Sequence, residues 1–432
     1  MLGDLRISLL SYDRPVFVGA IHDDGSDGSR FAYDATYLTR PDAIPLSFSL
    51  PLRAEPFTAS EYLPYFEGLL AEGMARRALA AELQLAENDT LAFLASCGRD
   101  CIGDVVVEQQ EDEPISETLA YEPVSPDELN RMFRSVSETA GENAASRLSL
   151  AGTQGKTGLA HDPRPPIEKG WLRPRGLAAT THILKTSYLH DLPEIEYLCM
   201  HAAAACGLDV ANTHLLDCGA PVLAVERFDR SVRMKGGKLR VERLHQEDLA
   251  QAFGMMPGSK YADLPEGSVR AIAGFLKKHS LKPARDLAEF CRILLFSYLI
   301  GNCDGHLKNY SIRLFPNPNG DNPFVSLTCA YDLVSTTRYP RFSRDMAIAI
   351  GGVRDIDAVG VDTLEALAAE LGMKRGALQR LARPMVDNVE DAIRRAGSGK
   401  EGAVLASTPY VADDLVEEMQ PRLKVLREFC LR

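Results

Sequence analysis

Apolar residues recur at helical spacing through the second half of the chain. The pattern predicts helices at residues 267–278, 285–301, 362–371, 376–397 and 412–429. Apolar side chains dominate RILLFSYLIG, residues 292–301, which indicates a buried helix. This helix runs directly into the polar segment NCDGHLKN, residues 302–309, so we expect it to hold that segment rigidly.

The first half of the chain is patterned differently. Residues 1–107 are predicted to form short strands and turns, followed by an amphipathic helix near 65–85. Residues 108–128 are acidic and contain proline, which is typical of a connector. The proline-rich segment 161–176 contains the only tryptophan, Trp171, and is predicted to be the mobile tip of a surface hairpin.

The segment NCDGHLKN has the spacing of a phosphotransferase loop. Asp304 lies five residues before Asn309, and Asp332 follows in the sequence AYDL. In phosphoryl transfer, a loop aspartate accepts the proton of the attacking hydroxyl, an asparagine five residues later holds a metal ion, and a later aspartate also binds metal. The alternative is that Asp304 and Gly305 form an ordinary surface turn. The crowding of hydrogen-bonding side chains around this dipeptide favours the phosphotransferase interpretation.

A glycine-rich turn lies upstream at SLAGTQGKTG, residues 149–158. Small residues allow backbone N–H groups to approach phosphate oxygens. Only two residues separate Gly152 from Gly155, whereas a Walker A loop has four at this point, so a P-loop NTPase is disfavoured. Taken alone, the segment is a weak signal and favours a plain glycine turn between two strands.

Two further segments complete the order of parts found in kinases. THILKTS, residues 181–187, is predicted to be a strand that presents Lys185, and the following segment 193–208 is predicted to be a helix with Glu194 and Glu196 in its first turns. In kinases such a lysine pairs with the phosphates and is steadied by a helix glutamate. The alternatives are a solvated lysine and glutamates placed favourably at the helix dipole.

These segments resemble the HipA family of toxin kinases. The resemblance extends from residue 1 to about residue 350 and is weakest in the C-terminal stretch. It rests on SRLSLAGTQGKT, THILK, VERFDR, LHQEDLAQAFG, NCDGHLKN and LTCAYDL, and on IPLSFSLPLR, YFEGLLAEG and GRDCIG in the first third.

The resemblance implies a bilobal, protein-kinase-like α+β fold. A HipA-like N-terminal subdomain is expected at residues 1–107, and the rest of a mixed N-terminal lobe, with the glycine-rich loop and the lysine strand, at 108–225. A mostly helical C-terminal lobe is expected at 226–432.

The resemblance also implies roles for individual residues. Asp304 would be the catalytic residue, Asn309 and Asp332 the Mg²⁺ ligands, and Glu196 the partner of Lys185. Residues expected to bind ATP are Ala151, Gly152, Thr153, Gln154, Gly155, Lys156, Lys185, Glu196, Glu226, Arg227, Phe228, His306, Lys308, Asn309, Tyr331 and Asp332. Residues 226–228 would meet adenine mainly through the backbone. His306 and Lys308 could equally orient the loop or balance its charge.

Partners and regulation follow from the same resemblance. The expected activity is a serine/threonine protein kinase that inhibits growth by phosphorylating a protein such as an aminoacyl-tRNA synthetase. A small HipB-like helix-turn-helix antitoxin is the expected partner, and it would mediate contact with operator DNA. Ser149, three residues before Gly152, matches a serine that such kinases phosphorylate in themselves.

Composition narrows the class of protein. The chain has 432 residues and a formal net charge of −12. This negative charge argues against extensive direct binding to nucleic acid. Residues 351–372 contain only one basic residue, Arg354, where some relatives are lysine-rich.

Nine scattered cysteines in apolar surroundings are typical of reduced core thiols. No stretch reaches the ~18 apolar residues of a membrane helix, and the first residues do not resemble an export signal, so a cytoplasmic location is expected.

Two alternatives remain open at this point. A small-molecule phosphotransferase would share the Asp304 loop and Asp332, but it would not account for the signatures of the first third. A catalytically silent corepressor scaffold would bind an antitoxin without transferring phosphate, and the intact set of Lys185, Asp304, Asn309 and Asp332 speaks against it.

Overall fold

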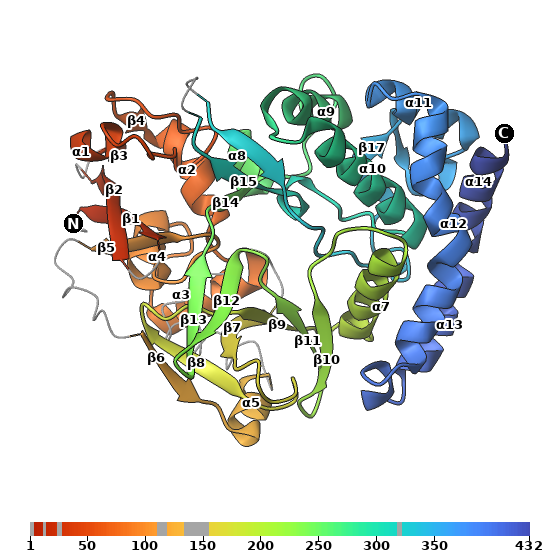
Figure 1. Ribbon diagram of the computed structural model, residues 1–432, viewed down its shortest axis with the longest axis horizontal. Coiled ribbons are helices and arrows are strands. Elements are labelled where there is room, and N and C mark those ends of the chain that lie inside the picture. Colours follow the sequence, from red (N-terminus) through yellow and green to blue (C-terminus); the bar gives the residue numbers. More distant parts are fainter. Residues whose placement is uncertain (1–3, 12–13, 24–27, 110–118, 134–154, 318–321) are drawn as a thin grey trace. The chain divides into compact units, whose positions relative to one another are not determined.

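The computed structural model describes residues 4–11, 14–23, 28–109, 119–133, 155–317 and 322–432. The chain forms two compact units (Figure 1). Unit 1 comprises residues 1–187, 218–257 and 313–323, and unit 2 comprises residues 188–217, 258–312 and 324–432. The predicted parts were continuous in sequence, whereas each of these units is built from three stretches of chain.

Unit 1 begins with a five-stranded antiparallel sheet in the order β4-β3-β2-β1-β5. Leu5, Ile7 and Leu9 of β1 lie on one face of the sheet and are buried in the main core of this unit. Leu10, on the other face, is buried against Val106 and Leu177. Helices α2 and α4 supply Tyr65 and Phe93 to the same core. The bounds are β1 Leu5–Ser11, β2 Arg14–His22, β3 Arg30–Tyr33, α1 Ala35–Leu38, β4 Phe57–Thr58, α2 Ala59–Gly68, α3 Gly73–Leu83, α4 Thr90–Cys97 and β5 Val105–Gln109.

A second antiparallel sheet of unit 1 contains the strands β11-β9-β7-β8-β6 in that order. The predicted lysine strand is its β9. The remaining elements of this unit are β6 Leu119–Pro123, α5 Pro126–Met132, β7 Gly155–His161, β8 Trp171–Gly176, β9 His182–Thr186, β11 Pro221–Glu226, β12 Arg230–Lys235, β13 Lys238–Arg243, β14 Gln246–Asp248 and α8 Leu249–Ala252.

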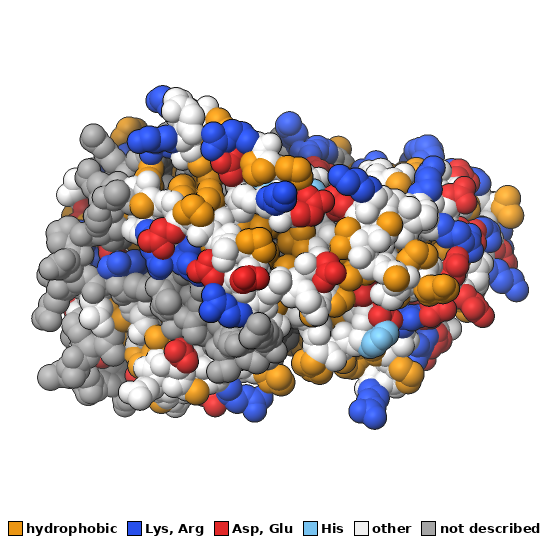
Figure 2. Space-filling model, turned by 90° about the horizontal axis from the view of Figure 1, so that it is seen from below, with side chains coloured by type: hydrophobic (Ala, Val, Ile, Leu, Met, Phe, Trp, Pro, Cys, Tyr) orange, Lys and Arg blue, Asp and Glu red, His pale blue; other side chains and the backbone are white. Residues whose placement is uncertain are grey.

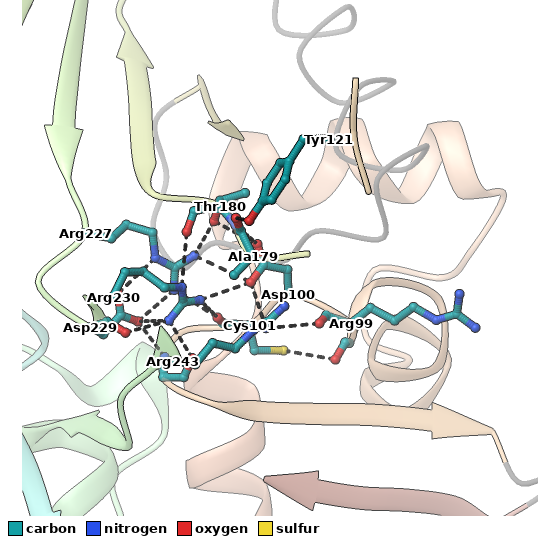
Figure 3. Close-up of polar contacts among 12 residues, drawn as sticks. Arg99, Asp100, Cys101, Tyr121, Ala179, Thr180, Arg227, Asp229, Arg230 and Arg243 are labelled. Carbon is teal, nitrogen blue, oxygen red and sulfur yellow. Dashed lines mark hydrogen bonds and ion pairs between the residues drawn. The ribbon is translucent and has the colours of Figure 1, made fainter. Parts of the chain in front are cut away.

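A buried ion cluster explains why the β12–β13 hairpin belongs to unit 1 (Figure 3). Arg230 and Arg243 each reach Asp100 Oδ1, at 3.0 and 2.8 Å. Arg227 Nη2 lies 2.7 Å from Asp229 Oδ2. All five side chains are at most 8% exposed, so each charge relies on the others for compensation. The cluster ties the hairpin to the loop after α4.

Unit 2 is mostly helical, and α7, α10, α13 and α14 all pack against α12 (Figure 1). The predicted helices at 267–278, 285–301, 362–371 and 376–397 are confirmed. The bounds are α7 Leu192–Ala205, β10 Thr213–Asp217, α9 Ser268–His279, α10 Pro283–Ile300, η2 Leu307–Asn309, β16 Phe324–Leu327, β17 Asp345–Ile350, β18 Val353–Asp355, η3 Ile356–Ala358, α11 Val361–Glu370, α12 Arg375–Ser398, η4 Gly402–Val404, α13 Thr408–Glu418 and α14 Gln420–Leu431. The 3₁₀ helix η1, Pro257–Ser259, and the strand β15, Ser311–Phe315, include residues of both units.

Two predicted helices are interrupted in the structure. The segment 65–85 contains the end of α2 and all of α3, with a break before Gly73, whose φ is +55°. The segment 412–429 contains parts of α13 and α14, and Pro421 lies in the first turn of α14. Proline lacks the N–H that would continue the preceding helix and its ring clashes with the previous turn, so the chain starts a new helix.

The prediction for Trp171 was wrong. Trp171 opens β8, and only 2% of its surface is exposed. Its ring centroid lies 5.0 Å from that of His161 and 5.2 Å from that of His182. The aromatic packing draws the residue into unit 1, which the proline-rich sequence around it did not reveal.

The described helices also bear on membrane association and on the cysteines. None of them combines the length and the apolar composition needed to cross a bilayer. All nine cysteines are free thiols, and every one except Cys329 is buried.

Candidate active site

The segment 302–309 is held at the end of α10 by a glycine. Gly301 caps the helix with a φ of +77°, and a Cβ at this position would collide with Thr337 Oγ1. The Thr336 hydroxyl donates to the Gly301 carbonyl at 3.1 Å and accepts from the Cys303 N–H at 2.9 Å. The buried helix and the segment around Thr336 therefore fix where the loop begins, as the apolar pattern predicted.

Hydrogen bonds within the loop bring Asp304 and Asn309 together. The Asp304 N–H donates to Asn302 Oδ1 at 3.0 Å, and Asn309 Nδ2 donates to the Asp304 carbonyl at 3.2 Å. The His306 N–H donates to the same carbonyl at 2.7 Å. Asp304 and Asn309 are both partly exposed, although Asn302 and His306 are buried. The loop thus presents two polar side chains from a rigid base.

Tyr331 connects the segment of Asp332 to this loop. Its hydroxyl donates to the Lys308 carbonyl at 2.8 Å and lies 2.6 Å from Ser311 Oγ. Asp332 itself has a φ of +59°, the left-handed conformation that is uncommon outside glycine. Such conformations concentrate at functional sites, where the surrounding structure maintains them. The structure therefore places the candidate metal ligand Asp332 immediately beside a residue bound to the Asp304 loop.

The oxygen atoms of Asn309 and Asp332 fit a magnesium ion. Mg²⁺ prefers hard oxygen ligands and is usually held in proteins by one or two side chains together with substrate phosphates. Asp332 is partly exposed and held in an unusual backbone conformation. Both features are expected of a carboxylate that binds a ligand and does not pack in the core.

In unit 1, Lys156 of β7 lies directly opposite Lys185 of β9. Directly opposed residues of an antiparallel pair present their side chains on the same face, and two like charges in this position are unfavourable without a counter-charge. Lys185 is buried and Lys156 is partly exposed. Two of the predicted phosphate-binding residues are therefore neighbours on one sheet.

Residues 226–228 contact other segments of unit 1. Arg227 donates to Asp229 and Thr180 through its guanidinium (Figure 3). Its backbone N–H donates to the Thr181 carbonyl at 2.9 Å. Glu226, at the end of β11, is paired in register with His182. Phe228 is half-buried in the turn that follows. The Arg227 side chain thus has a structural role, which leaves only the backbone for the predicted adenine contact.

The two candidate glutamates lie at the start of α7, and both are 2% exposed. Burial raises the pKa of Glu194, whose Oε1 lies 3.5 Å from Ser407 Oγ within unit 2. Glu194 lies in the first turn of α7, so the alternative of favourable placement at the helix dipole also agrees with the structure.

Five predicted residues lie outside the described part of the chain: Ser149, Ala151, Gly152, Thr153 and Gln154. Gly155 opens β7, and Lys156 follows it. Lys308 is buried, and the ring of His306 lies edge-on to the ring of Tyr261, with centroids 5.2 Å apart.

Tyr261 was missed by the sequence analysis. Its hydroxyl donates to Asp304 Oδ1 at 2.5 Å. Tyr261 precedes Asp304 by 43 residues, in a segment with no periodic pattern, so no sequence signal indicated this contact.

Comparison with protein families agrees with this arrangement. The HipA N-terminal domain model matches residues 12–108, and the HipA-like C-terminal domain model matches residues 148–393, more than half of the chain. The chain belongs to the HipA family. The resemblance predicted from the motifs is thereby confirmed.

Individual HipA relatives extend over nearly the whole chain. It is 33% identical to the putative kinase Y4mE of Sinorhizobium fredii over 388 residues, 88% of this chain and 89% of that one. It is 29% identical to the serine/threonine-protein kinase toxin HipA of Shewanella oneidensis over 410 residues, 91% of this chain and 88% of that one.

The HipA fold is confirmed by a solved structure, that of Shewanella oneidensis HipA with HipB and its operator DNA. The two chains superpose with a TM-score of 0.79, at 22% identity and 99% coverage of both. The predicted kinase-like α+β fold class is therefore correct.

Proposed function

We propose that this protein is an ATP- and Mg²⁺-dependent serine/threonine protein kinase. The observation that carries the proposal is the closed loop in which Asn309 binds the Asp304 carbonyl and Tyr331 binds the Lys308 carbonyl. This arrangement gathers a candidate base and two candidate metal ligands, in the order that phosphoryl transfer requires. The similarity to a kinase toxin supports the same assignment.

The roles of the residues follow from their chemistry. Asp304 orients the acceptor hydroxyl and takes its proton as the oxygen attacks the terminal phosphate. Asn309 and Asp332 would hold Mg²⁺, which neutralises charge on the phosphates when it is bound. Lys156 and Lys185 bind phosphate oxygens, and Glu196 steadies Lys185. Residues Ala151–Gln154, Glu226, Phe228, His306 and Tyr331 complete the proposed nucleotide site.

The cellular role proposed here is that of a toxin. Phosphorylation of a protein such as an aminoacyl-tRNA synthetase in the cytoplasm would arrest growth, and a HipB-like helix-turn-helix protein would act as antitoxin. The relative solved with HipB and operator DNA supports this partner. Growth arrest on expression, relieved by the protein from a neighbouring reading frame, tests the role.

Contact with operator DNA is proposed to run through the antitoxin. Arg354, the single basic residue of segment 351–372, pairs with Asp263 at 2.6 Å. On the face shown in Figure 2, lysine and arginine side chains are interspersed with acidic ones. Strong direct binding to DNA requires clustered positive charge. In a gel-shift assay, the protein alone should therefore leave operator DNA unshifted.

The decisive experiment on the chemistry is Asp304→Asn, because asparagine preserves the shape and removes the proton acceptor. Transfer of phosphate from Mg-ATP should fall by about 10²- to 10⁴-fold, with the thermal midpoint nearly unchanged. Asp391→Asn, at an exposed position of α12, is the matched control and should retain activity. Undiminished transfer by folded Asp304→Asn protein would remove the assignment.

Self-inactivation at Ser149 is part of the proposal. A phosphate there would add about −1.5 to −2 charges beside the nucleotide loop and repel ATP or draw the loop outward through Arg147. Active protein should carry phosphate on Ser149, and Asp304→Asn protein should not. Peptide mass spectrometry after incubation with Mg-ATP distinguishes the two.

The same assays address the two alternatives. A small-molecule phosphotransferase would modify an aminoglycoside-type acceptor and leave protein acceptors untouched. A silent corepressor would bind the antitoxin and transfer no phosphate at all.

A further inference from the structure

The hydroxyl of a tyrosine is hydrogen-bonded to Asp304, the candidate catalytic base. Tyr261 belongs to the loop between η1 and α9, and its Oη donates to Asp304 Oδ1 at 2.5 Å. The edge of its ring meets His306, and the Lys260 ammonium lies 5.5 Å from the ring centroid. All these residues are part of unit 2.

The exposure of Tyr261 indicates that packing does not require this contact. The residue is 48% exposed, one of the more exposed large side chains among the described residues. Asp304 is also only partly buried. A distance of 2.5 Å is typical of a hydroxyl that donates to an ionised carboxylate. The contact is therefore a strong polar interaction at an accessible point.

The chemistry of the contact matches that of an acceptor. A serine or threonine substrate must bring an O–H group to Asp304, because an ionised carboxylate offers only acceptor sites. Tyr261 already supplies such a group to Oδ1. We propose that the Tyr261 phenol occupies the position of the acceptor hydroxyl, so that a protein substrate enters only by displacing it. This inference rests on the proposed kinase function.

The loop itself is anchored next to the tyrosine. Asp263 pairs with Arg354, whose Nη1 donates to the carbonyls of Met346 and Ala347 at 3.0 and 3.1 Å. The Ala347 N–H in turn donates to the carbonyl of Cys303, the residue before Asp304. Leu264 is buried in the same loop. Because the backbone is held at these points, the phenol leaves by rotation of the side chain.

The bound Tyr261 hydroxyl also keeps water away from Asp304. While Tyr261 donates to Oδ1, a water molecule cannot take the same place on the base, so ATP is protected from hydrolysis in the absence of a protein acceptor. The tyrosine thus makes phosphate transfer conditional on an acceptor that binds well enough to replace it.

The test is Tyr261→Phe, which removes the hydroxyl and keeps the ring. A Ser149→Ala background prevents self-modification, and a synthetic peptide of residues 146–157 serves as the acceptor. We expect the peptide KM to fall about three- to tenfold at unchanged kcat, and ATP hydrolysis without peptide to rise by a similar factor. Tyr410→Phe, at a 74% exposed tyrosine of α13, is the control and should change neither quantity.

Opposite results overturn the inference. A lower kcat with unchanged KM would mean that Tyr261 positions Asp304 for catalysis. Unchanged KM and unchanged hydrolysis would mean that the phenol does not compete with either acceptor. Phosphate found on Tyr261 of the parent protein would support the inference, since it would show the phenol in the acceptor position.

A second readout does not depend on enzyme activity. With tyrosine labelled with ¹³C at Cζ, the Tyr261 resonance, assigned through Tyr261→Phe, should shift in Asp304→Asn protein and on addition of the peptide. An unmoved resonance in both cases overturns the inference. A shifted resonance together with no ATP turnover in parent protein would instead contradict the proposed kinase function.

Discussion

Lys156 and Lys185 face each other across two neighbouring strands, β7 and β9. Directly opposed residues of an antiparallel pair present their side chains on one face of the sheet. Lys185 is buried and Lys156 is partly exposed. We therefore expect Lys156 to contribute more to ligand binding than to the fold of unit 1.

Lys156→Gln should separate ligand binding from folding. Because Lys156 is partly exposed, its replacement is expected to leave the thermal midpoint nearly unchanged. ATP affinity should fall at the same time, by about tenfold, as a charged hydrogen bond to phosphate is lost. Calorimetry and thermal unfolding measure both quantities. Lys169→Gln, at an exposed position between β7 and β8, is the control.

Two substitutions of Asp332 should distinguish its effect on backbone conformation from its effect on ligand binding. Asparagine tolerates the left-handed conformation observed at this position, whereas alanine does not, so only Asp332→Ala should lose about 1 kcal/mol of stability. Both variants should lose Mg²⁺-dependent nucleotide binding, because neither carries the carboxylate. If Asp332→Asn protein bound Mg-ATP as tightly as the parent, the metal role of Asp332 would be wrong.

The ion cluster of Figure 3 should be sensitive to the loss of a single acid. Asp229→Asn leaves the three buried arginines of the cluster to share one carboxylate, that of Asp100. We expect a loss of about 3–5 kcal/mol in the free energy of unfolding. Glu242→Gln is the control, because the Arg233 side chain that it pairs with is 71% exposed, and it should change stability by less than about 1 kcal/mol.

The cluster also predicts a pH dependence. Burial by itself would raise the pKa of Asp229, but Arg227 and Arg230 outweigh it and hold this pKa well below its ordinary value. The stabilisation is therefore present above about pH 4 and is lost as the pH falls below that value. Urea unfolding of the parent and of Asp229→Asn protein should show their difference shrinking in acid. A constant difference would contradict the assignment.

Glu247 should have the opposite pH dependence. Burial raises its pKa to about 8, although Ser47 Oγ and the Phe48 N–H bind its oxygens at 2.5 and 2.7 Å. Between about pH 4.3 and 8 the folded state keeps a proton that the unfolded state releases, so stability falls as the pH rises.

Glu247→Gln removes this proton and retains the shape of the side chain. Its stability relative to the parent should rise by at most about 1.4 kcal/mol per pH unit over the same window and level off above pH 8. Urea unfolding at pH 5, 7 and 8.5 measures the trend. A pH-independent difference would show that Glu247 ionises normally in the folded protein.

The local elements and the family were determined by the sequence alone. Periodic apolar residues predicted α9, α10, α11 and α12 to within a few residues, because each helix must bury one face. The candidate site residues Asp304, Asn309 and Asp332 could be recognised without a structure, because they lie close together along the chain or within a recognisable motif. The HipA signatures likewise needed no structure.

Contacts between distant segments were decided only by the tertiary structure. The role of Arg227 depends on Asp100, which lies 127 residues earlier in the chain and joins it in one buried cluster. Trp171 is buried because His161 and His182 come from two other strands of the same sheet. Tyr261 reaches Asp304 through a loop whose sequence has no periodic signal. Burial and charge compensation depend on the whole surroundings of a side chain, and those surroundings exist only once the chain has folded.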